Sequence, residues 1–136
     1  MTKIKVTYSD TLRTTATHEN GAELITDGPK EVGGVGEYFS PTDLFAASLA
    51  SCMLTLMALA AKKMDLSLET TKALVEKEMS TSPPRRVAKI KVVVESTLDP
   101  TPEQKQKLEA AANHCPVHLS LHPEIQQEIT FRWGTI

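Results

Sequence analysis

The chain has 136 residues, a length that commonly forms one domain with its own hydrophobic core, so we predict a single domain over residues 1–136. Its 15 basic and 17 acidic residues nearly cancel, which argues against a nucleic-acid partner. The two cysteines are too far apart for a CxxC motif and too few for a disulfide framework, and the first residues lack the apolar run of a signal peptide. We therefore expect a cytoplasmic protein with reduced thiols.

Short alternating patterns near the beginning of the chain predict three antiparallel strands. Apolar and polar residues alternate over residues 4–8, a second strand covers about residues 12–19, and a third covers residues 23–27. Asn20-Gly21 between the second and third strands is a strong hairpin signal. The chain is therefore expected to start as an antiparallel meander.

The hairpin sequence also predicts a register. A two-residue turn at Asn20-Gly21 would pair Glu19 with Ala22. In that register Arg13, at the far end of the second strand, lies roughly opposite Gly28.

Residues 28–39 hold four of the six glycines of the chain. Their spacing does not follow GxGxxG, so we exclude a nucleotide-binding loop. We interpret the segment as a mobile flap over the start of the next helix, and a plain connector is the alternative.

A long helix is predicted after this segment. Ser40 can cap it, Pro41 suits its first position, and Asp43 in the first turn complements the helix dipole. Residues 44–61 carry no charge, and Lys62-Lys63 end the helix with the favourable sign. Because the segment is apolar on every side, we expect burial nearly all round.

Two interpretations of this helix compete. Its length approaches that of a membrane span, but it is rich in alanine, contains Ser48, Ser51 and Thr55, and has no aromatic belt. We therefore predict a core helix and no membrane partner. One chain of this size can hardly cover such a helix, which favours a homodimer.

The second half of the chain predicts two more strands, a helix and a final strand. Residues 68–80 are expected as a strand because the strand at residues 86–98, after a proline break at 82–84, needs an antiparallel neighbour. A helix with a capping box begins at residues 101–104, and a last strand covers residues 125–133. The predicted class is α+β, with antiparallel sheets around a long central helix.

Histidines near the second cysteine raise the question of a metal. Three of them, His114, His118 and His122, lie close to Cys115 in the sequence. Prolines interrupt any helix there, and carboxylate ligands at a suitable spacing are missing. We therefore expect no metal, and a zinc-binding module that uses Cys115, His118 and His122 remains an alternative.

The cysteines themselves are the candidates for chemistry. The thiolate is the reactive form of cysteine, and burial in an apolar helix disfavours it. Cys52 lies far from the helix start, so a reactive Cys52 needs a cation from elsewhere. Arg13 is the most plausible of the four arginines, with Asp43 or Thr42 available to orient it. The alternative is that Cys52 is only a small core residue.

Three stretches of the chain resemble one known family. The run from Ser40 to Cys52, the upstream Gly33-Gly34, and the stretch His114-Cys115-Pro116-Val117 resemble the OsmC/Ohr family of hydroperoxide reductases. The resemblance extends over nearly the whole chain. It implies an intertwined homodimer with active sites at the subunit interface. The reaction that it implies needs no metal, flavin or nucleotide cofactor.

The resemblance also implies roles for the two cysteines. Cys52 would attack an organic hydroperoxide and become a sulfenic acid, and Cys115 would resolve it as a disulfide that an external dithiol, for example of lipoyl type, reopens. Arg13 falls where the family carries its activating arginine, but Thr42 stands where well-studied members carry a glutamate. An OsmC-like binding or structural protein with inert thiols is therefore the alternative. We expect the peroxide to sit among apolar side chains, namely Leu44, Phe45, Leu49 and Leu56.

Overall fold

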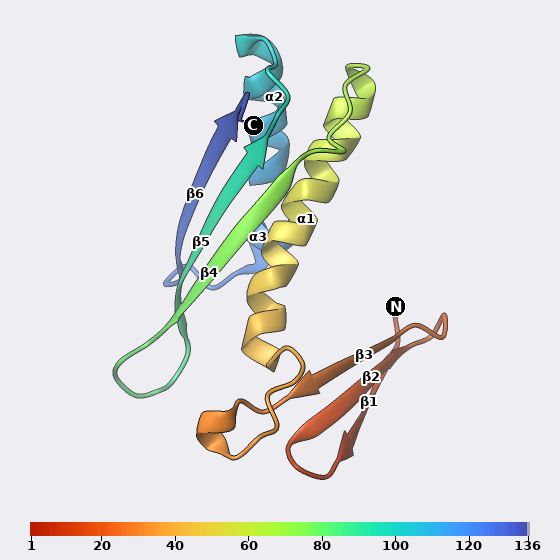
Figure 1. Cartoon of the computed structure of the whole chain (residues 1–136), viewed down its shortest axis with the longest axis vertical. Helices are drawn as coiled ribbons and strands as arrows, with labels where there is room; N and C mark the ends of the chain where they lie inside the picture. Colours follow the sequence, from red (N-terminus) through yellow and green to blue (C-terminus); the bar gives the residue numbers. More distant parts are fainter. Residues whose placement is uncertain (136) are drawn as a thin grey trace. The chain divides into compact units, whose positions relative to one another are not determined.

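The computed structural model describes residues 1–135, which form two compact units. The N-terminal unit, residues 1–45, holds β1 (Ile4–Ser9), β2 (Arg13–His18), β3 (Glu23–Asp27), the 3-10 helix η1 (Lys30–Val32) and the beginning of α1 (Pro41–Lys63). The C-terminal unit, from Ala46 onward, holds the rest of α1, then β4 (Lys72–Met79), β5 (Val87–Ser96), α2 (Pro102–Asn113), α3 (Pro116–Ser120) and β6 (Gln126–Trp133) (Figure 1). The predicted α+β class with a long central helix is confirmed, whereas the single domain stays a prediction.

The first three strands form an antiparallel sheet in the order β1-β2-β3, as predicted. The hairpin register differs by one residue from the prediction, because Thr17 pairs with Glu23 and the loop has three residues instead of two. Gly21 closes this loop with a φ of 94°, a conformation that glycine adopts without a steric penalty. The shift places Arg13 opposite Asp27, not opposite Gly28.

The N-terminal unit has no apolar core of its own. Throughout residues 1–45 the buried side chains are polar, namely Thr26, Asp27 and Ser40. The apolar side chains of β1 face solvent in the single chain, and Val6 is 61% exposed. A sheet of three strands needs an apolar face packed against something to be stable, so this unit requires a covering surface.

The glycine-rich segment after β3 is folded rather than a plain extended connector. It contains η1, and Gly34 donates its N–H to the carbonyl of Pro29. The backbone of Gly34 lies so close to Gly28 that a Cβ atom on Gly34 would fall 1.8 Å from the Gly28 carbonyl oxygen. Only glycine fits there, which explains part of the glycine content. The mobility expected of this flap stays a prediction.

The second sheet has the order β4-β5-β6 and departs from the predicted all-antiparallel pairing. β4 and β5 are antiparallel, but β6 runs parallel to β5. The physical reason is the connection: α2 and α3 carry the chain back along the sheet before β6 begins, as in other crossover connections. The strands themselves were predicted, and their relative direction was not.

One face of this second sheet packs on the helices, and the other is covered with charged side chains. Ile90, Val92 and Val94 of β5 are buried in a core cluster that also contains side chains of α1 and α2. On the opposite face Lys89 pairs with Glu128 at 3.0 Å, and Arg132 lies 3.4 Å from Glu95. The outer face is therefore a solvated surface.

α1 is buried along one stripe, which is less than the burial expected from its composition. The buried members of the helix are Ala46, Leu49, Ala50, Met53, Met57 and Ala61. Leu59, on another side, is 55% exposed. By length and composition α1 could cross a membrane, but a core helix passes the same test, and this stripe belongs to the core cluster. α1 is therefore a core helix, and the expectation of burial all round is wrong for a single chain.

Candidate functional site

The two cysteines, distant in sequence, come together in the C-terminal unit. Cys52 lies in the middle of α1 and is half-buried, and Cys115 lies between α2 and α3 and is fully buried. Both thiols are free, and they lie close enough for Cys52 to raise the pKa of the Cys115 thiol. The arrangement therefore places one partly accessible thiol directly against one inaccessible thiol.

Cys115 owes its position to a break between two helices. The helix predicted to begin at residues 101–104 is α2, and in the structure it ends at Asn113. Cys115 is the N-cap residue of the next helix, α3, and Pro116 occupies the first helical position. The Cys115 Sγ atom accepts the backbone N–H of His118 at 3.2 Å. Burial raises the pKa of the Cys115 thiol, the His118 N–H opposes this rise, and contact with Cys52 adds to it. At neutral pH Cys115 is therefore a protonated thiol.

Arg13, the predicted activating cation, is held in the N-terminal unit by two carboxylates. Its Nε and Nη2 atoms donate to the two oxygens of Asp27 at 2.7 and 3.0 Å, and Nη2 also donates to Glu37 at 3.4 Å. The guanidinium lies 4.9 Å from the ring centre of Tyr38, a cation–π distance. These contacts fix the plane of the guanidinium. The hydrogen bonds use its Nε and Nη2 atoms and not its Nη1 atom.

Asp27 is the candidate site residue that sequence reasoning missed. Its carboxylate is buried, accepts two bonds from Arg13, and accepts the backbone N–H groups of Glu37 and Tyr38. The Arg13 guanidinium is the main cause that lowers the pKa of Asp27 to about 2, and burial opposes it. Asp27 thus joins the arginine to the glycine-rich segment. A three-residue hairpin loop was the signal that could have revealed it, since that register sets Arg13 opposite Asp27.

Asp43 was predicted to orient Arg13, together with Thr42 as an alternative. In the structure Asp43 accepts the backbone N–H of Ser40 at 3.0 Å, and the Ser40 hydroxyl accepts the backbone N–H of Asp43 at 3.1 Å. This reciprocal pair caps the beginning of α1. The residues that orient Arg13 are Asp27 and Glu37, and a catalytic role of Asp43 stays a prediction.

Arg13 and the cysteines belong to different units of the chain, Arg13 to the N-terminal unit and the thiols to the C-terminal unit. A direct interaction between Arg13 and Cys52 therefore remains the prediction that the sequence made.

The zinc alternative has no ligand set in the structure. Within residues 1–135 no three His, Cys, Asp or Glu side chains converge as metal ligands. His118 is hydrogen-bonded through Nδ1 to Gln127, and the Nδ1 atom of His122 accepts the N–H of Glu124. The three proposed ligands are thus engaged separately.

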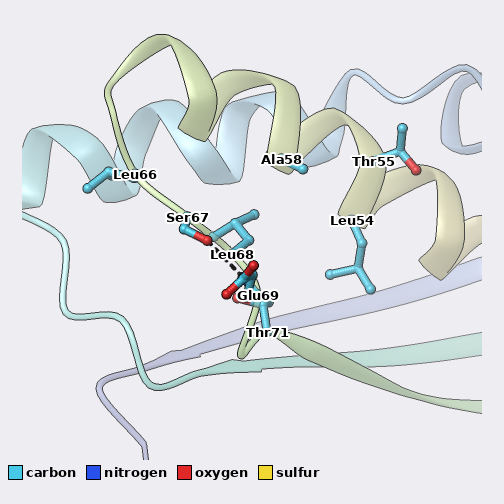
Figure 2. A pocket seen from close by; sticks show the side chains of 8 residues that line it. All are labelled: Leu54, Thr55, Ala58, Leu66, Ser67, Leu68, Glu69 and Thr71. Carbon is cyan, nitrogen blue, oxygen red and sulfur yellow. Dashed lines mark hydrogen bonds between the residues drawn. The ribbon is translucent and has the colours of Figure 1, made fainter.

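The apolar pocket expected around Cys52 needs correction. Leu49, one of its four expected members, is fully buried in the core cluster and cannot line an open pocket. A pocket of about 500 Å³ does lie beside the second half of α1 and the loop leading to β4, as Figure 2 shows. Its lining residues are Leu54, Thr55, Ala58, Leu66, Ser67, Leu68, Glu69 and Thr71. Neither cysteine contributes to that pocket.

The buried Asp27 carboxylate leads to a prediction about acid. Because the pKa of Asp27 is lowered in the folded state, its carboxylate stabilises that state at any pH above about 3.9, the pKa of an aspartate in the unfolded chain. This stabilisation disappears as the pH falls toward 2. Asp27→Asn should lower Tm at pH 7 by more than about 4 °C. The difference from the parent should narrow below about pH 4. Thermal unfolding at pH 7, 4 and 2.5 measures it, with Asp10→Asn in the exposed turn as control. A difference that does not change with pH would contradict the prediction.

Comparison with known proteins agrees with this fold. The family model described as OsmC-like protein matches residues 34–130. A solved Psychrobacter arcticus 273-4 protein, named for an osmotic stress induced and detoxification response, is 41% identical, with 97% of this chain and 96% of that chain covered and a TM-score of 0.92.

Two more distant structures share the fold. The organic hydroperoxide resistance protein OsmC of Legionella pneumophila is 20% identical, with 97% and 96% coverage and a TM-score of 0.76. The organic hydroperoxide resistance protein OhrB of Bacillus subtilis is 18% identical, with 97% and 98% coverage and a TM-score of 0.68. Among curated proteins no match was found. The extent of the family match and the 41% identity together show that this chain belongs to the OsmC family.

Proposed function

We propose that the protein is a thiol-dependent peroxidase that reduces organic hydroperoxides to alcohols. The observation that carries this proposal is the pair of free thiols that lie close enough to interact, one partly accessible and the other buried. Distant family members named organic hydroperoxide resistance proteins support the substrate class. The family fold and the core position of α1 support a cytoplasmic protein.

The proposed reaction has three steps. The Cys52 thiolate attacks the distal oxygen of the hydroperoxide, the O–O bond breaks, and the alkoxide leaves as an alcohol after taking up a proton. Cys52 is then a sulfenic acid. The Cys115 sulfur attacks the Cys52 sulfur, the S–O bond breaks, and water leaves. An external dithiol reduces the disulfide and is itself oxidised to a disulfide.

Arg13 is proposed to stabilise the Cys52 thiolate and to orient the peroxide. One guanidinium faces two carboxylates, so the group of Arg13, Asp27 and Glu37 carries a net charge of about −1. A long-range electrostatic effect on a thiolate would therefore be weak. Arg13 would act by direct hydrogen bonding from Nη1, while Asp27 keeps the guanidinium in place.

A homodimer is the proposed assembly. The N-terminal unit has an exposed β1 and no buried apolar side chain among residues 1–45, and α1 leaves Leu59 exposed. A second copy would cover both kinds of surface, and the burial of apolar area would stabilise the pair.

Sedimentation should show a dimer at micromolar concentration. Leu59→Lys should weaken the association by at least about tenfold, because it puts a charge into the proposed apolar interface. Leu74→Lys is the matched control, since Leu74 is 64% exposed on the charged face of the second sheet. A stable and well-folded parent monomer, or equal effects of the two substitutions, would contradict the assembly.

Consumption of cumene hydroperoxide and of hydrogen peroxide, measured side by side with a dithiol present, tests the activity. We expect faster consumption of the organic peroxide and no consumption without the dithiol beyond one equivalent. If Cys52 reacts slowly with an alkylating agent at neutral pH and neither peroxide is consumed, the protein is instead an OsmC-like protein with inert thiols.

A further inference from the structure

A chain of two hydrogen bonds joins the buried thiol Cys115 to the last strand of the sheet. The backbone N–H of His118 donates to the Cys115 Sγ atom at 3.2 Å, and the ring Nδ1 atom of the same histidine is bonded to the Oε1 atom of Gln127 on β6. Gln127 pairs in register with Ile90, which is fully buried at the centre of the sheet. One residue therefore connects the thiol to a rigid element.

The direction of the second hydrogen bond follows from its acceptor. An amide oxygen has no proton to give, so the Nδ1 atom of His118 must carry the hydrogen and donate it to Gln127. The bond thereby requires a hydrogen on Nδ1 and holds the ring in one orientation. The bond holds the first turn of α3, from which the His118 N–H points at the sulfur.

α3 needs such an anchor because its own packing is slight. It has five residues, none of them buried, and its helical hydrogen bonds are too few to stabilise it in isolation. Val117 and Leu121 pack only partly against the core cluster. The side-chain bond to Gln127 therefore adds a contact that fixes α3, besides the core burial of Cys115 and the hydrogen bond from its backbone N–H to the Ala112 carbonyl.

We infer that His118, held by Gln127, is a positioning residue for the resolving step that Cys115 performs. The inference rests on the proposed function. Resolution requires the Cys115 sulfur to form a bond with the Cys52 sulfur while the Cys52 S–O bond breaks. The thiol proton leaves with the hydroxyl group as water, so the step needs no further oxidant or reductant. The His118 N–H stabilises negative charge that develops on the Cys115 sulfur, and the ring keeps that N–H in line. The step in which peroxide meets Cys52 does not involve this contact.

A first experiment does not depend on peroxide chemistry. In a Cys52→Ser background, the alkylation rate of Cys115 by iodoacetamide reports how often the buried thiol becomes accessible. His118→Ala and Gln127→Leu should each raise this rate by about 2- to 10-fold, the range expected for loss of one hydrogen bond. Gln127→Glu, which still accepts from Nδ1, should keep the parent rate. His114→Ala is the matched control, because His114 flanks Cys115 on the other side and bonds only within its own region, to the carbonyl of Ala110.

A second experiment separates the two chemical steps in the protein with both cysteines. After one equivalent of cumene hydroperoxide, sulfenic acid formation on Cys52 should keep its parent rate in His118→Ala. Disulfide formation should be slower by about 2- to 10-fold. The double variant with Gln127→Leu should be no slower than either single variant, because the two residues share one hydrogen bond.

The outcomes separate this inference from the proposed function. If the parent does not consume peroxide, the alkylation experiment, and disulfide formation driven by diamide, still test the role of His118. Equal alkylation rates in His118→Ala and the parent would overturn the inference. So would an equal rise in His114→Ala, which would indicate general loosening of the region, or an equal slowing of both chemical steps.

Discussion

Peroxide consumption is expected to vanish in Cys52→Ser and to lose turnover after about one equivalent per chain in Cys115→Ser. Cys52 lies in the middle of a 23-residue helix, half-buried, where a substrate can reach a sulfur that is held in place. Cys115 has no exposed surface, and burial raises the pKa of its thiol. The first attack should therefore belong to Cys52, and Cys115 should act only after Cys52 is oxidised.

Mass spectrometry after peroxide treatment measures this asymmetry. Cys115→Ser should accumulate a sulfenic acid on Cys52 that dimedone traps, and excess peroxide should convert it to sulfinic acid. The parent should instead form the Cys52–Cys115 disulfide. A sulfenic acid on Cys115 in the Cys52→Ser protein would reverse the two roles, and the absence of oxidation at either cysteine would favour inert thiols.

Arg13→Ala is expected to slow the reaction of Cys52 with peroxide by about 10- to 100-fold, the range that follows from the loss of one hydrogen bond between charged groups. Because this variant leaves the buried Asp27 carboxylate without its cation, it is also expected to be less stable. Arg13→Lys separates the two effects. A lysine keeps a positive charge beside Asp27 but loses the planar guanidinium, so it should restore stability and only part of the rate.

The measurements are the second-order rate constant with cumene hydroperoxide and the alkylation rate of Cys52 at neutral pH. Circular dichroism confirms that each variant is folded. Arg132→Ala is the control, since Arg132 forms only a partly exposed ion pair with Glu95 on the second sheet. If Arg13→Lys and Arg13→Ala are both folded and both react as fast as the parent, Arg13 has no part in activating the thiol.

The local elements could be predicted because their signals are short in range. The strong capping signals at Ser40-Pro41 and at residues 101–104 set the beginnings of α1 and α2, and the capping box of α2 is present as expected. The alternation over residues 86–98 predicted β5, which covers Val87–Ser96, and its buried face. The candidate thiols were also identifiable, because cysteine chemistry requires no particular neighbour in the sequence.

The pairing of the strands and the hydrogen-bond partners of the site residues could not be predicted in the same way. A change of one residue in the hairpin loop moves Arg13 from Gly28 to Asp27, and both loop lengths suit Asn20-Gly21. The direction of β6 depends on how α2 and α3 return the chain, not on the residues of the strand. The hydrogen bond between His118 and Gln127 could not be predicted either. It joins a histidine that no sequence pattern marks as paired to a strand residue nine positions later.

The sequence by itself determined where the six strands and the two long helices form, which side chains could do chemistry, and the family resemblance, because these depend on neighbouring residues and on residue type. Only the tertiary structure decided the strand register, the parallel pairing of β6, the carboxylates that hold Arg13, and the surroundings of Cys115. Each of these depends on segments distant in sequence that meet only when the chain packs, and several arrangements of the same elements satisfy the local preferences equally well.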